Sequence, residues 1–367
     1  MTMEGLKVID SLRDRPLSDV LKEGGLVGAG GAGFPTWAKY VAAHPYHVTN
    51  AQESEPGYYI DKWLHKARAK EFAELYQWLL GWGVKKIIVA PKYKDRPWFE
   101  ELEALTKGEV LDCRGKNRYR PDDVDNPILF TYTDDKYAFG KESALLLICG
   151  GVKIGPGERP TDHGYIVNNS QTLFNMHALL TTGRPLTRKY VHVYGETPKH
   201  VFLDAPVGTL AEDLLQAAGT SVDEIRAKGF VVVEGGPGWY EVVETPASFS
   251  LTKRTNSLLV VDPAFRDPTQ KDVLEKPNQP GYPRTPASAH QQEPSAPLEP
   301  ARVRVRLVDN PRFAAILPAV PTVQPGDAVT AGDVVAKAAS EGFSVNQHAP
   351  VTGKITAVTD AWVEIER

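Results

Sequence analysis

Cysteine is scarce in this chain of 367 residues, which contains only Cys113 and Cys149. An iron–sulfur cluster takes about four thiolates, so two cysteines are too few to hold one. They are also too far apart in sequence for the short ligand spacings of a zinc site. Cys149, in LLLICGG, is expected to be a buried apolar residue, and Cys113 to be exposed. The composition therefore predicts a protein without an iron–sulfur cluster.

Long apolar runs and an excess of positive charge are also missing. No segment approaches the ~20 apolar residues of a membrane-spanning helix. Lys and Arg number 42 against 46 Asp and Glu, and no stretch is basic enough to neutralise a nucleic-acid backbone. The start, MTMEGLKVID, has neither the basic end nor the apolar core of a signal peptide. We expect a cytoplasmic protein of several domains, with no membrane span, no nucleic-acid partner and an oligomeric state left open.

The first half of the chain has the pattern of an α/β layer. Amphipathic pieces between Leu6 and Leu21 precede the glycine-rich segment GGLVGAGGAGFPT. Hydrophobic residues at helical spacing predict one long helix from about Asp61 to Trp82. VKKIIVAP and ILFTYT, which starts at Ile128, are short apolar runs typical of buried strands. This order of loop, helix and strand predicts an α/β domain over residues 1–188.

The second half changes to short strands and turns. KYVHVYG, HVFLDAPVGT and GFVVVEGGP, with one helix between Leu210 and Ala218, predict a small β-rich domain over residues 189–262. Nine prolines among polar residues predict an extended linker over residues 263–300. Beyond it, RVRVRLV and the paired Gly-Asp turns of VQPGDAVTAGDVVAKA predict a compact all-β module over residues 301–367.

The nine histidines show no metal-site pattern. His163, His177, His192 and His200 are scattered, and no two have a spacing that suggests a metal pair on one helix face. They are expected to be structural or solvated, and His348 to lie in a turn. No metal site is therefore predicted.

The segment from Gly28 to Gly33 matches G-x-G-x-x-G, the pattern whose glycines let a main chain approach a phosphate. That pattern normally follows a strand directly. Here the residues before Gly24 look helical, and Phe34-Pro35 follows the glycines. The pattern alone favours a plain flexible loop and leaves a phosphate-binding loop as the alternative.

Four motifs in order resemble those of one flavoprotein family: GAGGAGFPTWAK, NAQESEPG, GKESAL and VNNSQTL. They are similar to the NADH-binding flavin subunit of respiratory complex I, and more closely to the RnfC subunit of ion-pumping ferredoxin oxidoreductases and the PduS-type cobalamin reductases. PGDAVTAGDVVA and HAPVTGKITAV resemble the barrel-sandwich domain of RnfC. The resemblance implies a flavin-binding α/β domain, an SLBB β-grasp domain from Lys189 to about Val243, and an all-β barrel-sandwich hybrid module.

The resemblance also implies FMN as cofactor and NAD(P)H as electron donor. The residues implied for FMN are glycines of the loop and five polar side chains: Gly28, Gly30, Gly31, Gly33, Lys39, Asn50, Asn168, Asn169 and Thr172. Main-chain amides suit a phosphate, and asparagine amides offer a donor and an acceptor to ribityl hydroxyls and ring edges. Phe34 is implied to stack with the nicotinamide cofactor, and Glu55 and Glu142 to bind or orient it.

Three departures from the family pattern limit this transfer. Lys141-Glu142 replaces a pair of glutamates, and Ala42 replaces an aromatic residue that contacts adenine in the complex I subunit. The cysteine-rich motifs that follow TKRTNSLLVV in the relatives are missing. Electrons are therefore expected to pass directly from FMN to a corrinoid (cobalamin) or to a redox partner protein, recognised by the β-grasp domain. The C-terminal module on its linker is expected to act as a mobile lid or docking arm.

Two other functions stay open. A non-catalytic scaffold subunit of a redox complex is favoured by the missing cysteines and by Ala42, and is opposed by the retained glycine loop. A quinone-binding subunit like NqrA has a related fold without clusters, and no residue here decides for or against quinone.

Overall fold

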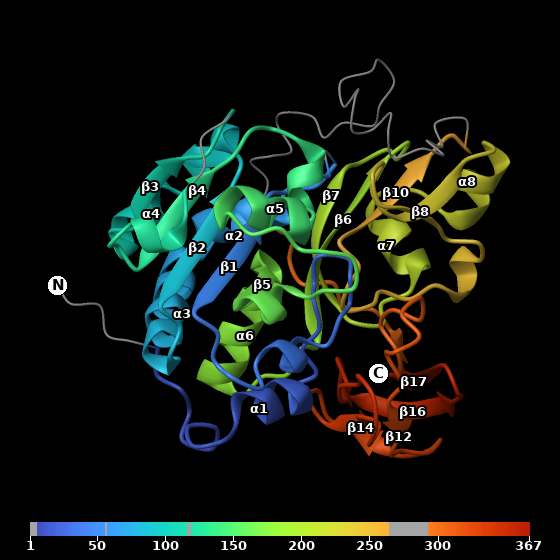
Figure 1. The fold of residues 1–367 in the computed structure, drawn as a ribbon. Helices are drawn as coiled ribbons and strands as arrows, with labels where there is room; N and C mark the ends of the chain where they lie inside the picture. The colour runs from blue at the N-terminus through green and yellow to red at the C-terminus, as the bar shows by residue number, and fades with distance from the viewer. Residues whose placement is uncertain (1–5, 56, 116–118, 264–292) are drawn as a thin grey trace. The chain divides into compact units, whose positions relative to one another are not determined.

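The computed structural model describes residues 6–55, 57–115, 119–263 and 293–367 (Figure 1). The chain divides into two compact units. Unit 1 comprises residues 1–18, 37–54 and 59–183, and unit 2 comprises residues 19–36, 55–58 and 184–367. The glycine loop and Glu55 therefore belong to unit 2, together with the C-terminal half of the chain.

Unit 1 is built on a parallel five-stranded sheet with the order β3-β4-β2-β1-β5. Its strands are β1 (Tyr46–Ala51), β2 (Lys86–Pro91), β3 (Glu109–Asp112), β4 (Ile128–Tyr132) and β5 (Tyr165–Asn169). Strand β1 pairs with β2 on one side and with β5 on the other, so the strand order reverses between β1 and β5. Ligands of such open α/β sheets bind beyond the carboxyl ends of the strands at this switch point.

Helices cover both faces of this sheet (Figure 1). Leu145 of α5 packs with Val48 and Val167 in the core on one face. On the other face, Thr49 hydrogen-bonds to Tyr76 of α3, at 2.9 Å. The α-helices are α2 (Ile60–Ala67), α3 (Ala69–Trp82), α4 (Glu100–Thr106), α5 (Glu142–Cys149) and α6 (Ser170–Thr182). The 3-10 helices are η2 (Tyr93–Trp98), η3 (Pro121–Asp123), η4 (Tyr137–Gly140) and η5 (Pro160–His163).

The single helix expected from Asp61 to Trp82 is wrong, because α2 and α3 are separate helices that meet at Arg68. Arg68 leaves helical geometry, with φ of −131° and ψ of 32°. No glycine or proline marks this break in the sequence. The strands expected at VKKIIVAP and ILFTYT are confirmed as β2 and β4. Two further helices, α1 (Leu17–Glu23) and η1 (Thr36–Lys39), contain residues of both units.

Unit 2 contains a mixed sheet with the order β7-β6-β10-β8-β9. Its strands are β6 (Arg188–Gly195), β7 (Val201–Pro206), β8 (Val231–Gly235), β9 (Tyr240–Val242) and β10 (Ser257–Val261). The first and last strands, β6 and β10, are parallel neighbours in the middle, and the other pairs are antiparallel. The SLBB assignment of this part stays a prediction.

Two α-helices pack on this sheet, whereas one was expected from the sequence. Leu214 of α7 (Ala211–Ala217) and Ile225 of α8 (Val222–Ala227) share a core with Val191 and Leu258. The additional helix, α8, starts with a capping box between Ser221 and Glu224. A 3-10 helix, η6 (Pro246–Ser248), follows β9.

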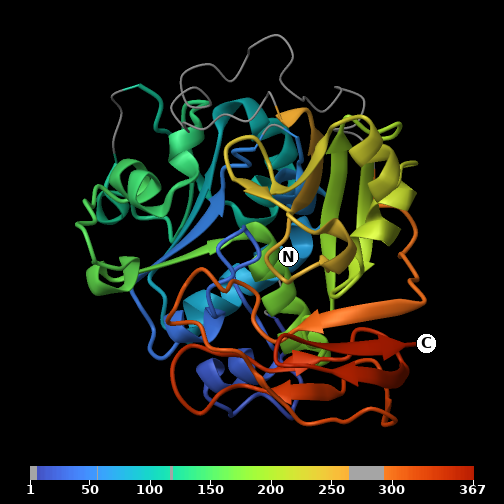
Figure 2. The ribbon, with the colours of Figure 1, turned by 90° about the vertical axis from the view of Figure 1, so that its right-hand side faces the viewer.

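The C-terminal module consists of two small antiparallel sheets, drawn in orange and red in Figure 2. Their orders are β11-β17-β16-β13 and β12-β14-β15. The strands are β11 (Arg302–Arg306), β12 (Val320–Pro321), β13 (Ala328–Val329), β14 (Val334–Lys337), β15 (Gln347–His348), β16 (Gly353–Val358) and β17 (Trp362–Glu366). Gly326 and Gly332 both have φ of 101°, a conformation that favours glycine. The expected all-β module with Gly-Asp turns is confirmed.

Main-chain hydrogen bonds join this module to the mixed-sheet part of unit 2. Thr209 and Val303 form an antiparallel bridge, and the amide of Arg304 donates to the main-chain oxygen of Gly208 at 2.8 Å. Upstream, the amide of Leu298 donates to the main-chain oxygen of a β7 residue. The role of this module as a mobile lid or docking arm stays a prediction. Residues 264–292 of the expected linker lie outside the described residues.

Single-residue expectations are also resolved. Cys113 is buried, not exposed, and lies in the same core cluster as Cys149, whose predicted burial is confirmed. His348 lies in strand β15, not in a turn. No helix in the described part of the chain has the length and apolar character to span a membrane.

Candidate functional site

In unit 1, four of the residues predicted for FMN gather at the switch point of the sheet. The strand register places Asn50 beside Asn169 at the carboxyl ends of β1 and β5. Helix α6 begins at Ser170, directly after β5, so Thr172 lies in its first turn. Asn168 completes the group on β5. Because a helix N-terminus carries a partial positive charge, this edge of the sheet favours an anionic or polar ligand.

Asn50 and Asn169 also hold the main chain around this edge. The Nδ2 atom of Asn50 donates to the main-chain oxygen of Gly140 at 2.8 Å. The Nδ2 atom of Asn169 lies 2.8 Å from both carboxylate oxygens of Asp61. Its Oδ1 atom accepts the amide of Gln171 at 2.9 Å and thereby caps α6. Each asparagine therefore uses part of its hydrogen-bonding capacity within unit 1.

Asn168 points into a buried polar cluster. Its Nδ2 atom donates to the hydroxyl of Tyr40 at 2.6 Å, and that hydroxyl lies 2.9 Å from Nε2 of His47. Burial, aided by the charge of Lys39, lowers the pKa of His47 to about 3. The imidazole is therefore neutral near pH 7. The Nδ2 atom of Asn168 already donates a hydrogen bond inside unit 1, so a contact of this nitrogen with FMN would have to share or replace that hydrogen bond.

Lys39 and Glu142, one predicted for FMN and the other for NAD(H), contact each other. The Nζ atom of Lys39 lies 3.3 Å from Oε1 of Glu142 and donates to the main-chain oxygen of Val167 at 2.7 Å. The carbonyl of Val167, on β5, thus positions the ammonium group near the strand end. Glu142 is the first residue of α5 and is 45% exposed at its side chain, so it is accessible to a ligand.

Glu53, in the motif NAQESEPG, was not predicted from the sequence. Its Oε2 atom accepts the amides of Asp61 at 2.6 Å and Lys62 at 3.2 Å, at the start of α2. Burial raises the pKa of Glu53 well above its ordinary value. Its φ is 38°, a strained value for a non-glycine residue. The motif thus contains a carboxyl group with a structural role of its own.

In unit 2, the glycine loop closes on itself. Val27 and Pro35 form an antiparallel bridge, and the amide of Gly33 donates to the main-chain oxygen of Gly28 at 3.0 Å. Gly31 and Gly33 have φ of 100° and 65°, so both positions favour glycine. The pattern alone favoured a flexible loop, but this loop is a turn fixed by its own hydrogen bonds.

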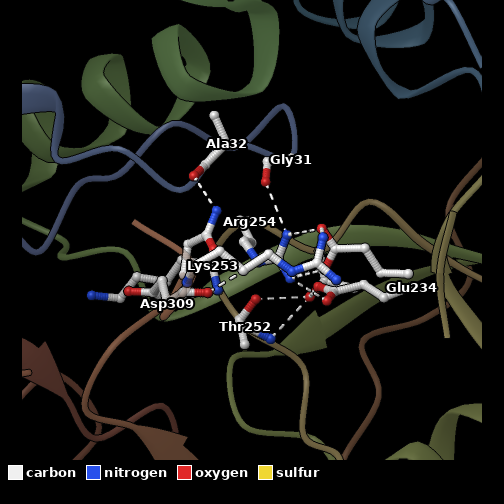
Figure 3. A network of polar contacts seen from close by, with 11 residues as sticks. Gly31, Ala32, Glu234, Thr252, Lys253, Arg254 and Asp309 are labelled. Carbon is white, nitrogen blue, oxygen red and sulfur yellow. Dashed lines mark hydrogen bonds and ion pairs between the residues drawn. The ribbon is translucent and has the colours of Figure 1, made fainter. Parts of the chain in front are cut away.

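Polar side chains donate hydrogen bonds to the carbonyl groups of this loop, and Figure 3 shows those at Gly31 and Ala32. Three of them donate to three main-chain oxygens: Lys189 to Ala29 at 2.9 Å, Arg254 to Gly31 at 3.1 Å and Asn310 to Ala32 at 2.7 Å. In a trans peptide, the N–H points opposite to the carbonyl. The amides of Gly30 and Ala32 therefore point away from these donors. Both residues are exposed, and exposed main-chain amides can bind an anion, so the loop is a candidate phosphate site.

Arg254 is the centre of a buried ion network (Figure 3). Its Nη2 atom lies 2.5 Å from Oε2 of Glu234 and 2.6 Å from Oε2 of Glu241. Arg312 adds a contact of 2.7 Å to Glu241. No role was predicted from the sequence for Arg254 or for the other two loop donors. Arg254 lies within TKRTNSLLVV, but its burial and pairing have no signal in the local sequence.

Phe34 and Glu55, predicted for NAD(H), both have contacts within unit 2. The ring of Phe34 lies 4.9 Å from that of Phe343, between centroids, in a tilted arrangement. Glu55 is buried, and its Oε2 atom accepts the amide of Gly238 at 3.1 Å. Phe34 thus packs against the C-terminal module, and Glu55 against the turn between β8 and β9.

Two histidines of unit 2 are closer than their sequence positions suggest. Nδ1 of His192 lies 2.9 Å from Nε2 of His200. Across residues 6–55, 57–115, 119–263 and 293–367, no group of three or more His, Cys, Asp or Glu side chains has the arrangement of a metal site. The ring of His192 also stacks on that of Phe202 of β7, at 4.3 Å between centroids, so the pair takes part in the packing of β6 and β7.

Two protein families match parts of the chain. The Nuo51 FMN-binding domain matches residues 21–178. The RnfC barrel sandwich hybrid domain matches residues 286–366. The two matches cover the glycine loop, the polar residues of unit 1 and the C-terminal module.

Individual relatives extend this likeness. Cobalamin reductase PduS of Salmonella typhimurium is 30% identical over 254 residues, which are 69% of this chain and 50% of PduS. The C subunit of the ion-translocating oxidoreductase complex of Erwinia tasmaniensis is 30% identical over 226 residues, 59% of this chain and 25% of that relative. The chain thus spans half or less of the length of these relatives.

A solved structure shares the fold. The NAD+-reducing NiFe hydrogenase in its H2-reduced state has a chain that aligns with a TM-score of 0.50 and 22% identity. The alignment covers 68% of this chain and 47% of the hydrogenase chain. At this identity the likeness concerns the fold alone.

Proposed function

Since this chain is a homologue of the PduS cobalamin reductases and of the RnfC subunits, as its motifs predict, we propose that it is a flavin oxidoreductase. In this proposal it binds FMN, oxidises NADH or NADPH and passes electrons to a corrinoid or to a redox partner protein. Flavin binding is supported by the match to the Nuo51 FMN-binding domain. The donor and the acceptor rest on the relatives and on the resemblance of the motifs.

The observation that carries the proposal is the glycine loop with its carbonyl groups held from one side. The outward amides of Gly30 and Ala32 would receive the phosphate of FMN, because they offer N–H donors without further movement of the main chain. The FMN contacts proposed for Lys39, Asn50 and Thr172 of unit 1 rest on the resemblance of the motifs. Bound FMN would supply the chemistry, since a flavin accepts a hydride and releases electrons singly.

The nucleotide is proposed to contact Phe34, Glu55 and Glu142. Of the two carboxylates in this set Glu142 is the more accessible, and its Oε1 atom lies 3.3 Å from Nζ of Lys39. Glu55 is buried and is proposed to orient the turn that it contacts. We place acceptor recognition on residues 189–243, the proposed SLBB β-grasp domain.

An anaerobic absorbance titration tests the proposal. FMN-reconstituted protein is freed of unbound flavin and titrated with NADH and, separately, with NADPH. Flavin that stays bound and bleaches supports the proposal, and addition of cobalamin to the reduced protein then tests the corrinoid acceptor. Bound flavin that neither nucleotide reduces contradicts the proposed donor. Protein that retains no flavin contradicts the proposal as a whole.

The engagement of Asn168 favours a second candidate, the non-catalytic scaffold subunit. Asn168 belongs to the set predicted for FMN, but its amide lies in a buried cluster with Tyr40 and His47. It therefore contributes to the fold without any ligand. The same titration separates the two functions, because a scaffold retains no reducible flavin.

A further inference from the structure

Trp239 is a large aromatic residue left exposed beside the glycine loop. Its side chain belongs to unit 2 and is 39% exposed. The Cε2 atom of the indole lies 3.9 Å from the position that a Cβ atom on Gly31 would take. Gly31 therefore leaves the space between the loop and the indole open, and a larger residue at this position would fill it. The indole therefore lies beside Gly31 of the loop.

A fixed turn presents this indole. The turn joins β8 to β9, and the amide of Gly236 donates to the main-chain oxygen of Trp239 at 3.0 Å. Gly235 has φ of 101°, and a Cβ atom there would come within 2.9 Å of Cδ1 of the indole. The carboxylate of Glu55 accepts the amide of Gly238 at 3.1 Å. The turn is held by its own main chain and by a buried carboxylate, so little ordering remains for a ligand to impose on Trp239.

We propose that Trp239 is the stacking platform for the planar ring of a nucleotide whose phosphate lies on the glycine loop. This inference deepens the proposed function and rests on it. Outward amides select a phosphate, and a neighbouring exposed indole offers a flat apolar face to a heteroaromatic ring. Stacking of a nucleic-acid base on an aromatic side chain tolerates different bases, because every base has a π-face. The ring is the isoalloxazine if the loop holds the phosphate of FMN, as proposed above. It is adenine if the loop instead holds a phosphate of the nicotinamide nucleotide.

The test measures the affinities of FMN and of AMP for the full chain by isothermal titration calorimetry. Trp239→Ala is expected to weaken binding of the stacked ligand about tenfold or more. Trp239→Phe keeps an aromatic face and is expected to retain most of the affinity. Phe313→Ala is the matched control, because Phe313 is also an exposed aromatic residue of unit 2, at 47%. It is expected to leave both affinities unchanged.

The two ligands identify the ring. A loss confined to FMN assigns Trp239 to the isoalloxazine, and a loss confined to AMP assigns it to adenine. The inference is overturned if Trp239→Ala leaves both affinities within about twofold of the wild type, or if Trp239→Phe loses as much as Trp239→Ala. Wild-type protein that binds neither ligand contradicts both this inference and the proposed function. Wild-type protein that binds them, with no effect of Trp239→Ala, contradicts this inference alone.

Discussion

Arg254 donates a hydrogen bond to the main-chain oxygen of Gly31 at 3.1 Å, and it does so from within a buried network of carboxylates (Figure 3). The glycine loop therefore depends on charges that are fixed elsewhere in unit 2. Lys189 and Asn310 repeat this arrangement at Ala29 and Ala32. The hydrogen bonds within the loop and these three donors together hold it in one conformation. The stability of unit 2 and the affinity of the loop are thereby linked.

Removal of the central cation tests this link. Arg254→Met leaves Glu234 buried without its cation and Glu241 with Arg312 alone, which is expected to lower the free energy of unfolding by about 3–5 kcal/mol. Urea unfolding at pH 7, followed by circular dichroism, measures the loss. The triple variant that adds Glu234→Gln and Glu241→Gln is expected to recover part of it. A loss of Arg254→Met below about 1 kcal/mol, the size seen for exposed pairs, would show that the network does not stabilise unit 2.

Asn310 allows the loop to be perturbed without breaking the ion network. Asn310→Ala removes the donor to Ala32 and is expected to weaken FMN binding about threefold to tenfold, the size of one neutral hydrogen bond. The matched control is Asn126→Ala in unit 1. Both asparagines donate to a main-chain oxygen, at 2.7 and 2.9 Å, and both accept the amide two residues ahead. Equal FMN affinities of the two variants would contradict a role of the hydrogen bond from Asn310 to Ala32 in ligand binding.

Local patterns predicted the elements that depend on local physics. The apolar run at VKKIIVAP forms β2, and the Gly-Asp turns form where positive φ is required. The capping box at Ser221 is a usable local signal for α8, although only one helix was predicted in this part of the chain. The break at Arg68 has no such signal in the local sequence, which contains neither glycine nor proline at this point. Burial of Cys113 likewise depends on residues far away in the chain.

The candidate site was predicted unevenly for the same reason. Motifs located the glycine loop and the polar residues of unit 1, since these carry distinctive residue types. They did not locate Arg254, Lys189 or Trp239, because a donor to a distant carbonyl or an indole beside a loop follows from tertiary structure. Roles in binding FMN or NAD(H) remain predictions for every residue of the set.

His47 gives unit 1 a defined response to acid. Burial lowers its pKa from 6.5 to about 3, so between these values the unfolded chain binds a proton that the folded chain does not. The free energy of unfolding is therefore expected to fall as the pH falls through this interval, by about 1.4 kcal/mol per pH unit at most. His47→Gln removes this contribution, and its slope of unfolding free energy against pH is expected to be shallower. Identical slopes would contradict a neutral, buried His47.

Asn169 separates helix capping from charge at the switch point. In the wild type, both carboxylate oxygens of Asp61 accept from Nδ2 of Asn169 at 2.8 Å. Asn169→Asp keeps an oxygen to cap α6 but places a second carboxylate beside Asp61. At pH 7 the variant is expected to lose about 1–3 kcal/mol of stability, because an acceptor replaces a buried donor. Asn169→Ser keeps a cap without a charge and serves as control. Since protonation of one carboxyl restores a donor, the loss for Asn169→Asp is expected to shrink near pH 4. A loss that does not change with pH would contradict charge repulsion as its cause.

The contact between Lys39 and Glu142 makes their separate roles testable. The pair is partly exposed, so its contribution to stability is expected to be below about 1 kcal/mol. A double-mutant cycle of Lys39→Met and Glu142→Gln measures this contribution by urea unfolding.

The effects of the two variants on ligand binding are expected to be larger and to differ. Lys39→Met removes a cation and should weaken FMN binding, whereas Glu142→Gln should raise the KM for NADH more than it changes FMN affinity. Glu142→Gln also releases Lys39 from its carboxylate, so FMN affinity should rise or stay constant in that variant. A fall in FMN affinity that is equal in both single variants would mean that the pair acts as one structural element, not as contacts to two ligands.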